Sequence, residues 1–135
     1  MPVGGDRPAT ADGGGAMKAI SLHQPWATMI AGGVKTIETR RWRTRHRGPL
    51  VICSSKLPAV TGHLCGYALC VVDVVGCRPM TVDDENAACC GLYDGAWAWE
   101  LVNLRVLRPF AVRGRQGFFE IPDGECIRNL KGKTR

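Results

Sequence analysis

The sequence of 135 residues has no run of roughly 18 or more apolar residues, which excludes a predicted transmembrane helix. It also lacks the basic and then apolar N-terminal pattern of a secretory signal, so we expect a cytoplasmic protein with reduced thiols. No Cys-x-x-Cys spacing occurs among the seven cysteines, and their odd number argues against a complete disulfide framework. We therefore expect no structural zinc site, no other metal and no cofactor.

Apolar residues make up 45% and charged residues 22% of the chain, which is typical of a globular domain. Residues 1–16 are rich in glycine and poor in apolar side chains, and this composition predicts a disordered leader. Residues 128–135 are basic and polar and are predicted to form a loose tail. The remaining residues, 17–127, are enough for one domain with a core that needs no disulfide or metal.

Short apolar segments dominate the pattern and predict more strands than helices. The strands are expected at residues 18–22, 36–43, 50–54, 67–75, 97–107 and 118–121. One short helix is expected to begin at Pro25 and to end at Gly32, and a second to span residues 82–90, where Thr81 and Asp84 form a capping-box pattern. The sequence therefore predicts a mainly β, α+β fold: a small barrel of five or six mostly antiparallel strands with two short helices.

The four tryptophans differ in their predicted environment. Trp97 and Trp99 share strand parity, which predicts that both face the core. Trp26 lies on the apolar face of the first helix, so core packing is favoured for it as well. Trp42 stands among arginines, where it either stacks on unpaired bases or plugs one end of the barrel.

The net charge of +6 is concentrated in residues 35–56, which contain seven basic residues and a single acidic residue, Glu38. The seven basic residues are Lys35, Arg40, Arg41, Arg43, Arg45, Arg47 and Lys56. A second basic group contains no acid and consists of Arg105, Arg108, Arg113 and Arg115. Charge clustered in this way favours a polyanionic partner, and a solvated face is the alternative.

Three charged residues lie within six positions of one another: Lys35, Glu38 and Arg40. At this spacing Glu38 can accept hydrogen bonds from both cations, which predicts an ion-paired cluster at the start of a strand. A desolvated lysine beside another cation can act as a base or a nucleophile. The alternative is a surface row of salt bridges with no chemistry.

The segment Gly33-x-Lys35-x-x-Glu38-x-Arg40 resembles the G-x-K-x-x-E-x-R signature of ASCH domains, which are related to PUA-like RNA-binding domains. The segments 18–27, 47–56, 66–80 and 97–121 resemble further parts of the family in the same order, so the resemblance covers about residues 17–122. It implies a PUA-like β-barrel with a cleft beside it, and RNA or a nucleotide as the ligand.

The resemblance also implies the positions of the ligand-binding residues. Lys35, Glu38 and Arg40, called the signature residues below, would form the cleft wall, and Gln24 and Trp26 would line the cleft from the helix entry. Lys56 would stand at the end of the neighbouring strand. The charge pattern, independently of the resemblance, agrees with this placement. The arginines that surround Trp42 are expected to track a phosphate backbone with salt-dependent affinity; they are Arg40, Arg41, Arg43, Arg45 and Arg47.

Some ASCH relatives are enzymes, and the resemblance is therefore compatible with a hydrolase as well as with a binding domain. One bacterial branch removes acyl groups from N4-acetylcytidine with residues that match Lys35 and Arg40, but it carries threonine in place of Glu38. A further carboxylate would have to come from a later segment, with Asp83, Asp84 and Glu85 as candidates. A metal-independent single-strand ribonuclease that uses Lys35 and Glu38 would fit the same cleft. A basic face of this kind would also suit a module that binds an acidic protein.

Overall fold

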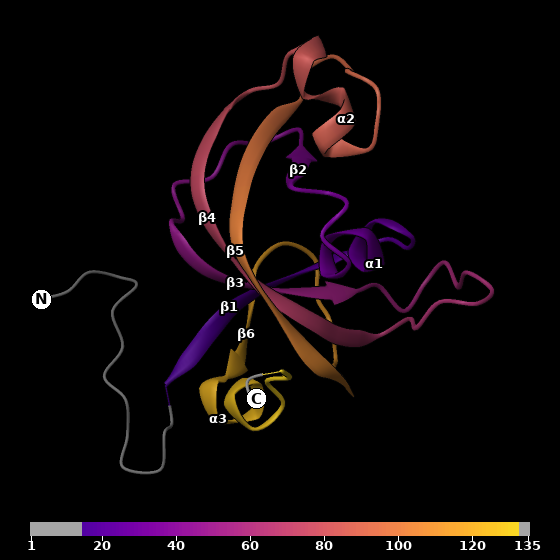
Figure 1. Ribbon diagram of the computed structural model, residues 1–135, viewed down its shortest axis with the longest axis vertical. Coiled ribbons are helices and arrows are strands. Elements are labelled where there is room, and N and C mark those ends of the chain that lie inside the picture. Colours follow the sequence, from indigo (N-terminus) through magenta and orange to yellow (C-terminus); the bar gives the residue numbers. More distant parts are fainter. Residues whose placement is uncertain (1–14, 133–135) are drawn as a thin grey trace, which may run out of the picture.

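The computed structural model describes residues 15–132 and consists of one six-stranded sheet with short helices on its faces and rim (Figure 1). The strands are Ala16–Leu22 (β1), Ile37–Arg40 (β2), Gly48–Ser54 (β3), Tyr67–Pro79 (β4), Trp97–Ala111 (β5) and Phe119–Pro122 (β6). The helices are Trp26–Ala31 (α1), the 3-10 turn Val82–Asp84 (η1), Glu85–Ala88 (α2) and Asp123–Arg128 (α3). This architecture confirms the predicted class, mainly β with short helices, and adds α3 to the two predicted helices.

The strand order in the sheet is β2-β5-β4-β3-β1-β6, and the sheet curls into a half-barrel (Figure 1). All neighbouring pairs are antiparallel except β1 and β3, which are parallel. The carboxyl ends of β1 and β3 therefore meet at the same edge of the sheet. Register shifts along the β4–β5 pair bend these two long strands, because each bulge adds local twist.

Two of the three apolar clusters lie on the two faces of the sheet. The first packs α1 against the sheet through Ala27 and Ile30 and contains Trp99, which is fully buried as predicted. The second packs α3 against the other face through Cys126. Burial of each large apolar side chain contributes about 1.5–3 kcal/mol, so both faces stabilise the sheet.

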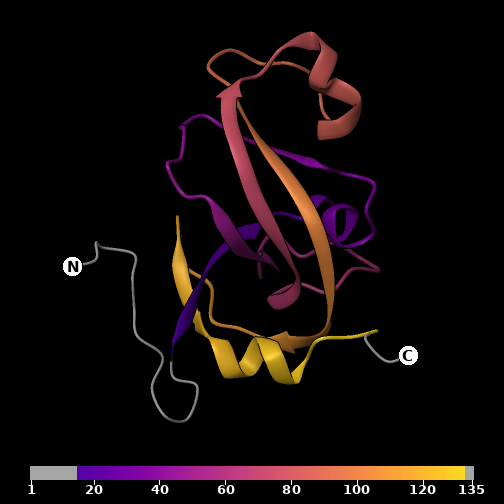
Figure 2. The ribbon, with the colours of Figure 1, turned by 60° about the vertical axis from the view of Figure 1, so that its left-hand side comes forward.

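The C-terminal segment is more ordered than the predicted tail. Helix α3 carries acidic residues in its first turn and Arg128 in its last turn, an arrangement that suits the helix dipole. Beyond it, the N–H of Arg108 donates to the carbonyl of Asn129 at 2.7 Å, and the N–H of Lys131 donates to Val106 at 2.9 Å. Figure 2 shows α3 lying across one end of the sheet beside β6. Residues 133–135 of the predicted tail lie outside the described residues.

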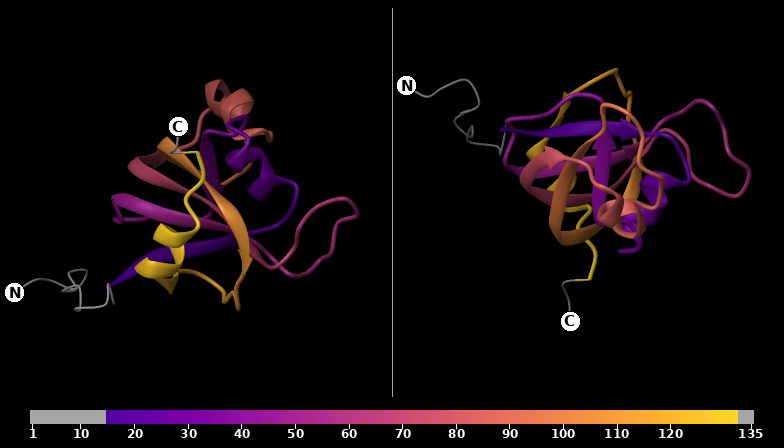
Figure 3. Two further views of the ribbon diagram at one scale, coloured as in Figure 1. Left: turned by 60° about the horizontal axis from the view of Figure 1, so that its bottom comes forward. Right: turned by 90° about the horizontal axis from the view of Figure 1, so that it is seen from above.

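At the N-terminus, β1 begins at Ala16, one residue before the predicted start of the domain. Residues 1–14 of the predicted leader lie outside the described residues. The loop of residues 55–66, between β3 and β4, projects away from the sheet (Figure 3). Within residues 15–132, the helices are all too short to cross a bilayer.

Candidate functional site

A cleft of about 1470 Å³ lies where the parallel strands β1 and β3 end. His23, which follows β1, and Ser55 and Lys56, which follow β3, stand on its wall. Other parts of the wall come from the start of α1, from β2 and the two residues after it, from the segment after α2, and from the β5–β6 loop. The charged residues that line the cleft are Lys35, Glu38, Arg40, Arg41, Lys56, Arg113 and Arg115. Six of these side chains are basic, and one, Glu38, is a carboxylate.

Lys35 lies on this wall and is only 2% exposed. Gly33 follows the C-cap residue of α1 and has a φ of 81°, a conformation that glycine adopts without strain; the chain then turns so that Lys35 reaches the cleft. The Lys35 ammonium donates to the carbonyl oxygen of Ala88 at 2.5 Å and lies 3.6 Å from Glu38 Oε1. An ammonium has three N–H donors, so these two contacts leave one for a ligand.

Glu38 and Arg40 extend this contact along β2. They are two residues apart in a strand and therefore lie on the same face. Arg40 Nε donates to Glu38 Oε2 at 2.9 Å, and Arg40 Nη2 donates to the carbonyl oxygen of Ser21 in β1 at 3.0 Å. The predicted ion-paired cluster is thus present, and it links α2, β2 and β1 across the cleft.

Two tryptophans open into the same cleft. Trp42 is 39% exposed and packs edge-on against the buried Trp99, with ring centroids 4.8 Å apart. It therefore closes one end of the core and also offers a surface to the cleft. Trp26 is 38% exposed, and its Nε1 donates to the carbonyl of Cys89 at 3.4 Å. The prediction that Trp26 packs in the core is wrong, because Ala27 and Ile30 form the buried side of α1.

A family model for the ASCH domain matches residues 20–110, about two thirds of the chain. The chain belongs to the ASCH domain family. Mouse and human Activating signal cointegrator 1 are each 47% identical to it over 36 residues, which is 27% of this chain and 6% of either relative. The ASCH domain described above therefore spans only a small part of the length of these relatives.

Solved structures of low sequence identity share the fold of this ASCH domain. An ASCH protein from Zymomonas mobilis aligns with a TM-score of 0.67 at 15% identity, covering 85% of this chain and 96% of that chain. A mutant form of the same protein aligns with a TM-score of 0.63 at 14% identity, covering 85% and 99%.

Several predicted site residues of this ASCH domain lie outside the cleft lining. Gln24 was predicted to line the cleft, but it does not. Its buried amide is bound instead to Thr28 and to the carbonyl of Leu64. The arginines that surround Trp42, Arg40 to Arg47, form the arginine run. Within it, Arg43 lies over the Trp97 ring, and Arg47 donates to nearby backbone carbonyls. These two arginines and the exposed Arg45 are absent from the wall of the cleft, unlike Arg40 and Arg41.

None of the three candidate carboxylates after β4 lines the cleft. Asp84 forms the predicted capping box with Thr81 and a two-pronged ion pair with Arg78, at 2.8 Å for each oxygen. These contacts hold the pKa of Asp84 well below its usual range. Glu85 accepts from the backbone N–H of Leu92, and Asp83 is exposed. The carboxylate that does line the cleft is Glu38.

Sequence reasoning missed the contribution of the β5–β6 loop, which brings Arg113 and Arg115 to the cleft. The available signal was the second basic group, which has no acid inside it. The structure divides that group, because Arg105 pairs with Asp73 at 2.8 Å and Arg108 binds carbonyl oxygens near the C-terminus.

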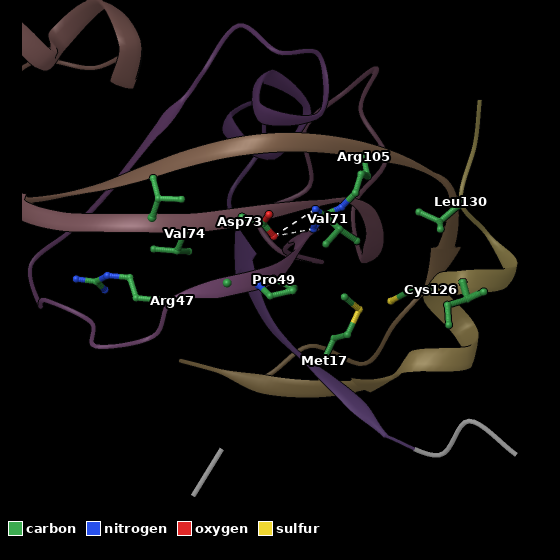
Figure 4. A pocket seen from close by; sticks show the side chains of 12 residues that line it. Met17, Arg47, Pro49, Val71, Asp73, Val74, Arg105, Cys126 and Leu130 are labelled. Atoms are coloured by element: carbon green, nitrogen blue, oxygen red, sulfur yellow. Dashed lines mark hydrogen bonds and ion pairs between the residues drawn. The ribbon is translucent and has the colours of Figure 1, made fainter. Parts of the chain in front are cut away.

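A second cavity of about 730 Å³ lies beside α3 (Figure 4). Met17, Val71, Cys126 and Leu130 make it largely apolar, and the Asp73–Arg105 ion pair forms its polar floor. Within residues 15–132, no group of three histidine, cysteine or acidic side chains is arranged to hold a metal ion.

Proposed function

We propose that this ASCH domain binds single-stranded RNA and that its cleft holds an unpaired nucleotide. The observation that carries the proposal is that two half-exposed tryptophans and six basic side chains open into one cleft. Cations bind phosphates, and aromatic rings stack on unpaired bases. The two groups together match the chemistry of a single strand better than that of a duplex, whose bases are already stacked.

The signature residues supply the polar contacts to such a nucleotide. Lys35 offers its remaining N–H donor to a phosphate or base oxygen. Glu38 orients Lys35 and Arg40 through its two oxygens. The low exposure of Lys35 and Glu38 keeps water away and strengthens each charge-assisted hydrogen bond.

The test is the affinity of a fluorescein-labelled single-stranded RNA of mixed sequence, measured by anisotropy. Trp26→Ala removes a stacking surface, so the affinity should fall by about 1–3 kcal/mol, or roughly 5- to 150-fold. Trp26→Phe should restore most of the affinity. Val34→Ala is the matched control, because Val34 is an exposed apolar residue that does not line the cleft.

Poly-glutamate separates this proposal from a module that binds an acidic protein. Its charge matches that of RNA, but it has no bases to stack. Equal affinity for poly-glutamate and RNA, with no effect of Trp26→Ala, would contradict RNA binding and favour the protein-interaction function.

A hydrolase on the same cleft is the second candidate, and the Lys35–Glu38 contact of 3.6 Å favours it. A lysine and a carboxylate at this separation can serve as an acid–base pair beside a phosphate or an amide. The substrate to use is a short RNA with one N4-acetylcytidine, incubated with a metal chelator and analysed by mass spectrometry. Loss of the acetyl group indicates an amidohydrolase, and shortened fragments indicate a ribonuclease. In either case the product must disappear with the Lys35→Met variant. If the RNA stays intact, the hydrolase function is contradicted and only the binding function remains.

A further inference from the structure

The β5–β6 loop, residues 112–118, contributes residues 112–117 to the lining of the cleft. The N–H of Val112 donates to the carbonyl of Gly66 at 3.0 Å. A Cβ atom on residue 114 would lie 2.7 Å from Ser21 Oγ, closer than real Cβ contacts allow. Glycine at position 114 therefore lets the loop backbone approach β1.

Arg113 and Arg115 flank this glycine and are exposed to the cleft. Within residues 15–132, neither guanidinium has a hydrogen bond or an ion pair, and the Lys56 ammonium likewise has none. Arg40 and Arg41, in contrast, are held by Glu38 and by the carbonyl of Asp94.

Lys56 lies close to the loop. A Cβ on Gly66 would come within 3.7 Å of the Lys56 Cβ, and the carbonyl of Gly66 binds the first residue of the loop. Lys56, Arg113 and Arg115 thus form one cationic end of the cleft, with no acidic partner among the described residues.

Of the two tryptophans in the cleft, Trp42 packs on Phe118 at the end of the β5–β6 loop, with ring centroids 5.5 Å apart, and Trp26 lies farther from this loop. A row of contacts crosses the cleft wall. Arg40 lies 3.0 Å from the carbonyl oxygen of Ser21 and 2.9 Å from Glu38. Lys35 lies 3.6 Å from Glu38 and 2.5 Å from the carbonyl oxygen of Ala88. Trp26 follows where this row ends, because its Nε1 binds the carbonyl of the next residue after Ala88. The signature residues therefore lie between the cationic end and Trp26.

We infer that the cationic end binds the phosphodiester backbone of an RNA strand and that the cleft takes two or more linked nucleotides rather than a free nucleoside. This inference rests on the proposed RNA binding. Phosphate groups would pair with the three cations that have no partner in the described part of the chain. A nucleoside carries no phosphate group. The volume of about 1470 Å³ also exceeds the roughly 300–1,000 Å³ of a typical small-molecule site.

The test compares a nucleoside, a dinucleotide and an RNA octamer as ligands of the full chain by isothermal titration calorimetry. The variant is Arg113→Ala/Arg115→Ala, and the matched control is Arg43→Ala/Arg45→Ala, which removes the same charge outside the cleft lining. The affinity of the wild type should rise from nucleoside to dinucleotide to octamer. The loop variant should bind the octamer at least about 10-fold more weakly, and its log–log salt slope should fall by about 1.4, the value for two contacts to a single strand.

Each outcome bears on a different claim. If the control weakens octamer binding as much as the loop variant does, or if the nucleoside binds as tightly as the octamer, the inference is overturned and RNA binding still stands. If the wild type binds none of the three ligands, the proposed function itself fails. The variants lie in exposed segments, and a thermal melt of each one confirms that it is folded.

Discussion

Asp84→Asn tests the structural role of the carboxylate that follows β4. Asp84 is 6% exposed, and its two oxygens accept from Arg78 and from the N–H of Thr81, each at 2.8 Å. The change keeps the shape of the side chain but removes its charge. Hydrogen bonds to charged groups contribute about 1.5–3 kcal/mol. Because the Arg78 side chain is 41% exposed, water replaces part of the interaction, and we expect a loss in the lower half of this range.

The matched control is Asp83→Asn, because Asp83 is exposed and its replacement changes the net charge equally. Urea unfolding followed by tryptophan fluorescence at pH 7 measures both variants. Asp84→Asn should lower the free energy of unfolding by about 1.5–2 kcal/mol, and Asp83→Asn should leave it within about 0.5 kcal/mol of the wild type.

The effect should depend on pH with a definite sign. The folded state holds the pKa of Asp84 below its usual value, so the stabilisation is fully present above about pH 4. It is lost as the pH falls further, and the gap between the wild type and Asp84→Asn should shrink in acid. Equal stability of the two asparagine variants at pH 7, or a gap that stays constant down to pH 2, would refute this account of Asp84.

Three further predictions concern the core and the thiols. Trp99→Ala should cost about 3–5 kcal/mol in urea unfolding, since the side chain is fully buried; a cost below about 1 kcal/mol would contradict its place in the core. Ser21→Ala should leave the melting temperature unchanged or raise it, because Ser21 Oγ is buried with no hydrogen-bond partner among the described residues, and a clear drop would reveal a missing partner. Burial raises the pKa of Cys70 to about 12 and of Cys126 to about 11, so iodoacetamide at pH 8 should modify Cys65 before either, as peptide mass spectrometry can check.

Local features of this chain can be predicted from the sequence, because their partners lie a few residues apart. The signature residues fall within six positions, and their ion pairs follow from that spacing. The capping box of Thr81 and Asp84 spans three residues, and the structure confirms it. Strand positions follow from short apolar segments bounded by glycine or proline, and these indicate the mainly β class.

Features that depend on distant contacts could not be predicted. Arg113 reaches the cleft because the loop packs on Ser21, more than 90 residues earlier in the chain, where no local pattern records the approach. Gln24 has the sequence position of a cleft residue, but its amide donates to the carbonyl of Leu64 on a projecting loop. The arginine run predicts one binding strip, yet the chain turns after Trp42 and carries Arg43 onto Trp97 instead.

The position of β2 in the sheet has a consequence for the behaviour of the protein in concentrated solution. β2 pairs with β5 along one edge, and it stands at the end of the strand order, so its other edge faces no further strand among the described residues. An open edge of this kind can recruit a strand from a second molecule, and charged side chains discourage such pairing. Glu38 and Arg40 occupy this strand. Replacing both with uncharged residues should therefore promote aggregation, which light scattering would detect as particles larger than the wild type.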